Sequence, residues 1–236
     1  MLSNVCQNSL ESCFAVFTFN QGDLIQKIIK EFDGSLENLQ EINHRKIIRE
    51  SCNIFCTYIL YIEDQVVKRN NKDFLVNTGG IYSILYNLVD CVSINQCVEK
   101  SLVHINKILK IFLFINNYAG IIEVSSRLYE IIENFFYNDD LKDETFIIFL
   151  RIIKKIFMVG GEINKRNNMN GLGDQANQLE NFNVLISQIR DEKMIVGYLT
   201  KFLYEDRIRN KIKEKVISAL VEIFKSNLIK AHNEEN

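Results

Sequence analysis

The sequence predicts an all-α protein built from stacked helical repeats, and three observations carry this prediction. Long apolar segments recur along the chain with the spacing of helices that are buried on two sides. Short clusters rich in glycine, asparagine and aspartate separate these segments. Three of the segments contain the same Ile-Phe pair, at residues 111–112, 156–157 and 223–224. A repeat of this kind usually provides a binding surface rather than an active site.

The individual helices follow from the apolar periodicity and from the turn signals between them. We expect a helix at residues 10–19, a helix pair at 23–32 and 42–67, and further helical units at 73–114, 118–159 and 179–229. Asp33-Gly34 and Gly160-Gly161 fit helix C-terminal caps, where glycine adopts a left-handed conformation at little cost. Ala119-Gly120 is read as a turn signal.

One domain is expected to span residues 1–236. It would begin with a capping helix within residues 1–22, contain a long polar loop at 160–178 and end in a tail at 231–236. The loop is predicted because this stretch combines several glycines and asparagines.

Composition is that of a folded protein with a sizeable core, since 47% of the 236 residues are hydrophobic and 25% are charged. A net charge of −2 argues against nucleic-acid binding, because binding the phosphate backbone needs a basic excess. No uninterrupted apolar run reaches the ~18 residues of a membrane span. Residues 1–20 lack the positive lead of a secretory signal, so a cytoplasmic location is expected.

The cysteines and the missing motifs argue against metal and enzyme chemistry. The six cysteines are Cys6, Cys13, Cys52, Cys56, Cys91 and Cys97. Their apolar helical surroundings favour reduced core thiols over a disulfide framework. Cys52 and Cys56 share a helix face, but a zinc site needs two more ligands and the histidines are scattered. The phosphate-binding, zinc-protease and hydrolase motifs are absent, so we expect no catalytic residue, no cofactor and no small-molecule substrate.

Residues 77–85, beginning Asn77-Thr78-Gly79-Gly80-Ile81, and residues 118–122 resemble armadillo repeats. In that family a short first helix ends in a glycine turn, a second helix begins with an apolar residue, and a long third helix follows. Repeats of roughly 40–47 residues are typical of the armadillo and HEAT classes. The resemblance covers residues 23–229 and is strongest over 73–159. It implies a right-handed α-solenoid of about four degenerate repeats.

The resemblance also implies that the third helices line a concave groove that holds an extended peptide or a partner helix. The predicted contact residues on this face are Asn53, Thr57, His104, Asn106, Lys110, Arg151, Lys155, Ser218 and Glu222. Asparagine can pair with a partner backbone, and the basic side chains favour an acidic partner. The alternative is that these residues form only the solvated face of amphipathic helices, with His104 a partly buried core residue.

The leading hypothesis is a non-enzymatic scaffold or adaptor that binds protein partners within a multi-subunit complex. Importin-type armadillo proteins pair an asparagine with a tryptophan on the third helix. This chain contains no tryptophan, and Arg151 and Ser218 replace asparagine in the later units, which argues against a nuclear-import adaptor. One alternative is a structural subunit of a cytoskeletal or ciliary assembly, since the composition resembles that of ciliate proteins. Another is a GTPase-binding regulatory domain, as in formins.

Overall fold

The computed structural model describes the chain in several stretches. They are residues 23–37, 39–71, 81–115, 117–136, 142–167, 184–188, 190, 195–204 and 210–234. These residues form helices joined by turns, and none of them lies in a β-strand. The all-α class is therefore confirmed for this part of the chain. The helix predicted at 10–19 and the glycine turn at 78–80 lie outside the described residues.

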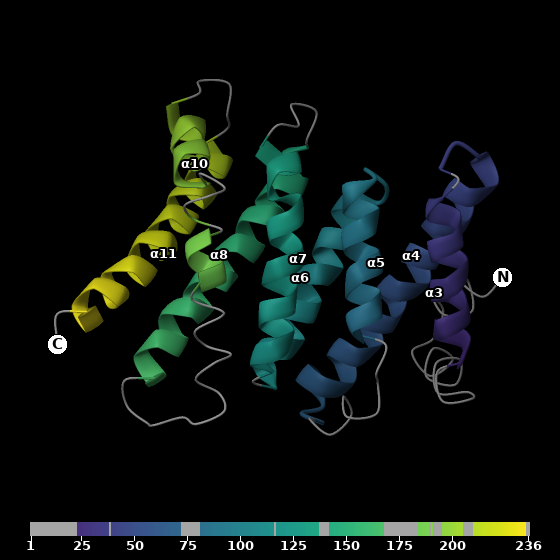
Figure 1. Ribbon diagram of the computed structural model, residues 1–236, viewed down its shortest axis with the longest axis horizontal. Coiled ribbons are helices and arrows are strands. Elements are labelled where there is room, and N and C mark those ends of the chain that lie inside the picture. The colour runs from purple at the N-terminus through teal and green to yellow at the C-terminus, as the bar shows by residue number, and fades with distance from the viewer. Residues whose placement is uncertain are drawn as a thin grey trace. The chain divides into compact units, whose positions relative to one another are not determined.

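The chain divides into two compact units, residues 1–120 and residues 121–236. The first contains α3 (Asp23–Leu36), α4 (Ile42–Glu63), the π-helix η2 (Asp64–Lys68), α5 (Ile81–Ser93) and α6 (Val98–Phe114). The second contains most of α7 (Tyr118–Phe136), together with α8 (Asp143–Asn167), α10 (Ile195–Tyr204) and α11 (Asn210–Glu234). Figure 1 labels the α-helices, coloured along the chain from purple to yellow. The single domain 1–236 stays a prediction.

In the first unit α4 contacts α3, α5 and α6. Phe32 of α3 meets Phe55 of α4 edge to face, with ring centroids 5.8 Å apart. The core consists of side chains of α4, α5 and α6 that have no exposed surface, among them Ile48, Ile59, Ile62, Ile84, Leu85, Leu88, Ile105, Ile108 and Leu109. Burying each such side chain contributes about 1.5–3 kcal/mol, so this apolar layer holds the helices of the unit together.

The start of α7 corrects the turn that was predicted at Ala119-Gly120, because both residues lie in the first turn of the helix. Asn117 Oδ1 accepts a hydrogen bond from the Gly120 backbone N–H at 3.0 Å, and the asparagine thereby caps α7. The Asn117 Nδ2 donates to the Tyr82 hydroxyl at 3.0 Å, and the Tyr82 ring stacks on Phe112. A Cβ atom at position 120 would lie 2.7 Å from the Phe112 ring. Glycine is therefore required by close packing against this ring.

Two helix ends predicted from glycines are wrong. α3 continues through Gly34 to Leu36, and α8 continues through Gly160 and Gly161 to Asn167. A glycine inside a helix costs roughly 1 kcal/mol relative to alanine, which weakens a helix without ending it. Residues 160–167 of the predicted loop are thus helical, and 168–178 lie outside the described residues.

In the second unit α11 contacts both α8 and α10. The rings of Phe146 in α8 and Phe202 in α10 have centroids 4.8 Å apart. The fully buried side chains of α7, α8 and α11 include Val124, Leu128, Ile132, Phe149, Ile156, Phe157, Val216 and Ile223. α11 therefore turns one apolar face toward the core of this unit.

The described cysteines carry free thiols. Cys52, Cys56 and Cys91 are buried and Cys97 is half-buried, so reduced thiols are confirmed for these four. Cys6 and Cys13 lie outside the described residues. Among the described helices, none combines the length and the apolar character needed to cross a membrane.

Candidate functional site

A row of polar contacts joins α4 to α6. We call it the α4–α6 seam, and it consists of Asn53 and Glu63 of α4 with Lys100, Lys107 and Lys110 of α6. Lys100 Nζ donates to Asn53 Oδ1, and Lys110 Nζ donates to Glu63 Oε1 at 2.8 Å. The partners in both contacts are 47 residues apart, so the two helices run parallel and in register.

Glu63 is the buried charge of the seam. The residue is only 8% exposed, and its carboxylate accepts hydrogen bonds from Lys107 and Lys110. Burial raises the pKa of Glu63, but the hydrogen bonds from the two ammonium groups outweigh burial and hold the pKa below its usual value. The carboxylate is therefore ionised at neutral pH. Two lysines around one carboxylate leave a net positive charge toward the end of α6.

Asn53 and Thr57, the predicted contact residues on α4, both form hydrogen bonds within the protein. Asn53 is half-buried, and its carbonyl oxygen accepts the hydrogen bond from Lys100. The Thr57 hydroxyl donates to the backbone carbonyl of Asn53 at 2.9 Å. The acceptor atom of the Asn53 amide is thus engaged in the seam, which leaves its N–H donors as the groups that could meet a partner.

His104 lies beneath this face. The residue is 6% exposed, and its Nδ1 is 2.8 Å from the carbonyl oxygen of Lys100. Because a carbonyl oxygen only accepts, Nδ1 carries the proton, and the buried Nε2 has a lone pair without a hydrogen-bond partner. Burial lowers the pKa of His104, so the ring is neutral at neutral pH. The ring is enclosed by its own protein, as the core alternative expected. On the same helix Asn106 is half-buried and Lys110 is exposed.

In the second unit the predicted contact residues lie on α8 and α11. Arg151 is exposed and Lys155 is half-buried on α8. The hydroxyl of Ser218 on α11 accepts a hydrogen bond from Lys154 Nζ at 2.7 Å. The contact between α8 and α11 therefore uses Lys154, the residue before the predicted Lys155. Glu222 accepts from a lysine one turn later in α11, at 3.2 Å.

An apolar stripe on α11 was not predicted. It consists of Ile217, Val221 and Phe224, which are 50%, 44% and 51% exposed, and we call it the α11 stripe. Residues three and four apart lie on one helix face, so these side chains form a continuous row. The signal that could have revealed it is a second apolar row of α11, offset from the row that includes the buried Val216 and Ile223.

The α11 stripe breaks the repeat pattern of the Ile-Phe pairs. Phe112 in α6 and Phe157 in α8 are 1% and 0% exposed, whereas Phe224 is 51% exposed. The preceding isoleucine is fully buried in all three helices. The pattern therefore identifies the core side of each helix correctly but does not reveal whether the phenylalanine is covered.

A groove of about 500 Å³ lies between α3 and α4. Its lining includes the apolar side chains of Ile28, Ile47 and Ile54 and charged side chains of both signs, Lys27, Glu31, Lys46 and Glu50. This groove is a second surface on which apolar groups lie beside charges.

No three histidine, cysteine, aspartate or glutamate side chains among the described residues are arranged to hold one metal ion. Comparison of the chain with known families, with characterised proteins and with solved structures found no match.

Proposed function

We propose that this chain is a non-enzymatic protein-interaction module with armadillo-like repeats, which binds a partner helix or peptide along its third-helix faces. The α11 stripe is the observation that carries the proposal. It lies beside Ser218 and Glu222, which the armadillo resemblance assigns to the concave face. Covering exposed apolar surface contributes about 25 cal/mol per Å², and contiguous exposed apolar rows commonly mark interaction sites.

The repeat architecture is supported by two independent features. The α4–α6 seam joins parallel helices at an interval of 47 residues. The Ile-Phe pairs place a fully buried isoleucine at the same pattern position in α6, α8 and α11. Both features are those expected of helix pairs that stack on one another. Within the all-α class, they favour a right-handed solenoid of about four repeats.

The partner that fits α11 is a protein segment with apolar side chains at helical spacing and acidic residues beside them. The apolar side chains would cover the α11 stripe, as when an amphipathic helix lies in a groove. Acidic residues are expected because lysines outnumber glutamates over residues 210–225 of α11. Such charge complementarity mainly accelerates association and sets the orientation of the partner.

A photo-crosslinking experiment tests this proposal. The full chain would carry a photoreactive amino acid at Val221 or Phe224 and would be irradiated in extract from its own cells. Both positions should yield the same discrete adduct, and Ile217→Asp should reduce it at least tenfold. Lys211 is exposed on α11 away from the stripe and provides the control position. Equal adducts from position 211, or none from either stripe position, would contradict the proposal.

The other functional hypotheses stay predictions. No contact among the described residues favours a cytoskeletal or ciliary subunit or a GTPase-binding domain, and neither is proposed here. A cytoplasmic location likewise remains an expectation from the sequence.

A further inference from the structure

The α11 stripe occupies a row of positions that is covered in the other two helices with an Ile-Phe pair. The row consists of the phenylalanine and the residues three and seven positions before it. Its members are Ile105, Leu109 and Phe112 in α6, and Leu150, Lys154 and Phe157 in α8. Every member except Lys154 is at most 2% exposed, whereas the residues of the α11 stripe are 44–51% exposed. α11 therefore exposes the side that α6 and α8 bury.

In α8 this row is the side on which α11 packs. Lys154 Nζ donates to the hydroxyl of Ser218 in α11 at 2.7 Å. The two helices lie side by side within the second unit (Figure 1). The next long helix of the chain thus covers the row of α8. The corresponding cover for the α11 stripe is one more long helix.

In the first unit α6 packs on the matching side of α4. Cys52-Asn53 in α4 aligns with Ile105-Asn106 in α6. The Cys52 Sγ atom is 3.6 Å from the hydroxyl oxygen of Ser101 in α6. The side of α4 that carries Cys52 therefore faces α6, as the row of α8 faces α11.

The opposite side of α4 forms the groove with α3. Ile54 lies two residues after Cys52, which is about 200° around the helix, and it lines the groove together with Ile47. In α6 the counterpart of Ile54 is Lys107, and Lys107 binds Glu63 of α4. The groove side of α4 therefore corresponds to the side with which α6 covers α4.

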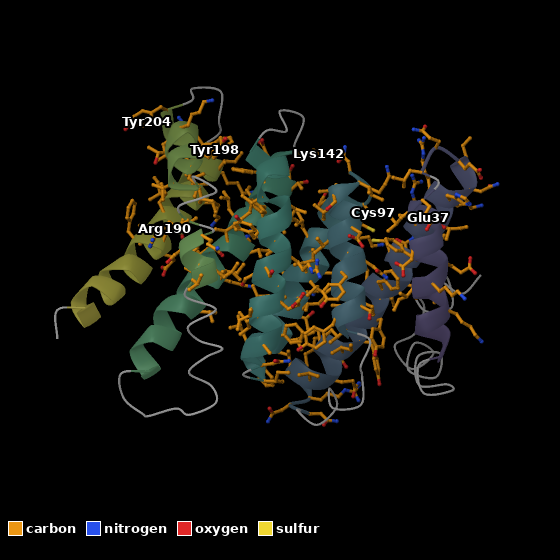
Figure 2. The ribbon with its side chains drawn as sticks, in the orientation of Figure 1. Glu37, Cys97, Lys142, Arg190, Tyr198 and Tyr204 are labelled. Atoms are coloured by element: carbon orange, nitrogen blue, oxygen red, sulfur yellow. The ribbon has the colours of Figure 1, made fainter. Side chains whose placement is uncertain are left out.

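The groove can receive a row of apolar side chains. Its volume is about 500 Å³, and its apolar lining comes from Ile28 of α3 and from Ile47 and Ile54 of α4. Figure 2 labels Glu37, the first residue after α3, in the turn that leads to α4. A row such as the α11 stripe forms a ridge, and ridges on one helix pack into the grooves of a neighbouring helix surface. The contact is favourable because apolar groups of both surfaces leave water.

We propose that the α11 stripe of one copy packs into the groove between α3 and α4 of a second copy. This assignment rests on the proposed function and makes the chain itself the partner of the α11 stripe. The groove also carries the acidic residues expected of that partner, Glu31 and Glu50. Each pairing uses one stripe and one groove. The contact is therefore heterologous, and it either closes into a ring of copies or continues into an open assembly.

Charges beside the two surfaces favour a parallel arrangement, like that of α4 and α6. Glu214 lies three residues before the stripe and Lys225 directly follows it, and both are exposed. Along α4 the exposed Lys46 comes before the exposed Glu50 at the groove. With the helices parallel, the acidic end of the stripe lies toward Lys46 and the basic end lies toward Glu50. Opposite charges then attract across the contact and set its orientation.

Sedimentation equilibrium of the purified full chain tests the proposal. The average mass should rise with protein concentration to at least twice the mass of the chain. Phe224→Asp should retain the fold, because the residue is 51% exposed, and should weaken association by about tenfold or more. Lys211→Asp is the matched control, since Lys211 is exposed on α11 away from the stripe. It should leave association unchanged, and an equal loss in both variants would overturn the proposal.

Mixing two variants distinguishes a stripe-to-groove contact from a stripe-to-stripe contact. Phe224→Asp keeps the groove intact, and Ile47→Asp keeps the stripe intact. Neither variant should associate alone, whereas an equimolar mixture should form a one-to-one complex. Association of Ile47→Asp alone would overturn the proposal, because the stripe would then bind without the groove. Circular dichroism checks that both variants are folded.

Charge reversal tests the same contact with exposed residues, where folding is not at risk. Lys46→Glu and Glu214→Lys should each weaken association by about threefold or more. The double variant should recover most of the loss, because the two charges are exchanged. Unchanged association in Lys46→Glu would overturn the proposal.

The outcome separates this inference from the proposed function. A wild-type chain that stays monomeric at the highest concentrations would overturn the inference and assign both surfaces to other occupants. The proposed function fails on a different result, the absence of any adduct from the photoreactive stripe positions in cell extract.

Discussion

The α4–α6 pair of the first unit and the α8–α11 pair of the second are both joined by lysine contacts, but they expose different surfaces. In the first, three lysines of α6 are bound to side chains of α4, and Glu63 is enclosed between two of them. In the second, Lys154 reaches Ser218, and α11 exposes an apolar stripe beside that contact. The lysines of α6 find their partners on α4, whereas α11 exposes a row of apolar side chains.

This difference arises from a few side chains. α6 carries lysines where α4 offers an amide and a carboxylate, so each of these lysines has a hydrogen-bond partner on α4. α11 carries isoleucine, valine and phenylalanine on an outward face instead. Helices that look alike in sequence can therefore differ in the side chains that they expose.

Truncating the two aligned phenylalanines gives the largest expected contrast. Phe157→Ala should lower the free energy of unfolding by about 3–5 kcal/mol, because the side chain is fully buried. Phe224→Ala should lower it by less than about 1 kcal/mol, because half of the residue is already exposed. Urea denaturation of the full chain measures both. A similar loss for the two variants would mean that the α11 stripe is covered in the free protein, and the contrast between the units would fail.

Glu63→Gln tests the charge of the α4–α6 seam. The substitution keeps the shape of the side chain but leaves Lys107 and Lys110 without their carboxylate. It should destabilise the protein by about 1–3 kcal/mol, the range for hydrogen bonds to charged groups. The urea midpoint of the protein should fall. An unchanged midpoint would show that water stabilises Lys107 and Lys110 as well as the carboxylate does.

Acid should have the same effect as this substitution. The pKa of Glu63 is lower in the folded state than in the unfolded chain, where it is near the ordinary value of about 4.3. Between these two values the unfolded state binds more protons, so stability falls as the pH falls. The contribution is complete above the unfolded pKa and is lost as the pH drops through the folded value. The difference in stability between wild type and Glu63→Gln should therefore shrink below about pH 4.

Two glycines extend the comparison to packing. Gly120→Ala should cost about 1–3 kcal/mol, because the new Cβ would lie 2.7 Å from a buried ring that is stacked on Tyr82. Gly197→Ala in α10 meets open space and should stabilise its helix by about 0.5–1 kcal/mol. Thermal unfolding of both variants shows whether each substitution lowers or raises the stability of the protein. A stabilising Gly120→Ala would show that the ring of Phe112 moves aside easily.

Local periodicity predicted that the described residues are mainly helical. The apolar spacing of residues 102–113 predicts a helix buried on two sides, and α6 has this form. Helix ends at glycine were less predictable, because a glycine ends a helix only when its backbone takes the left-handed conformation. Gly34 and Gly160 remain inside helices. The role of Gly120 depends on a ring eight residues earlier, and no turn rule contains that information.

Contacts between helices could not be predicted from one sequence. Asn53 was identified as a polar position on its helix, but its engagement by Lys100 depends on the register of α4 against α6. The exposure of Phe224 depends on which element covers it. The phenylalanine of the Ile-Phe pair is buried in α6 and α8 but exposed in α11. Sequence patterns thus identify the faces of a helix, whereas tertiary packing determines which face remains open.

The smallest effect is expected at the lysine contacts themselves. Asn53→Ala removes the acceptor of Lys100, and Ser218→Ala removes that of Lys154. Each should lower stability by at most about 1 kcal/mol, since a lysine near the surface can return to water. Differential scanning calorimetry compares the two variants. A loss above about 2 kcal/mol at Ser218 alone would show that α8 and α11 depend on a polar link rather than on their apolar core. Equal small losses would assign the difference between the units to Glu63 and the α11 stripe, because these are the features that the lysine contacts do not share.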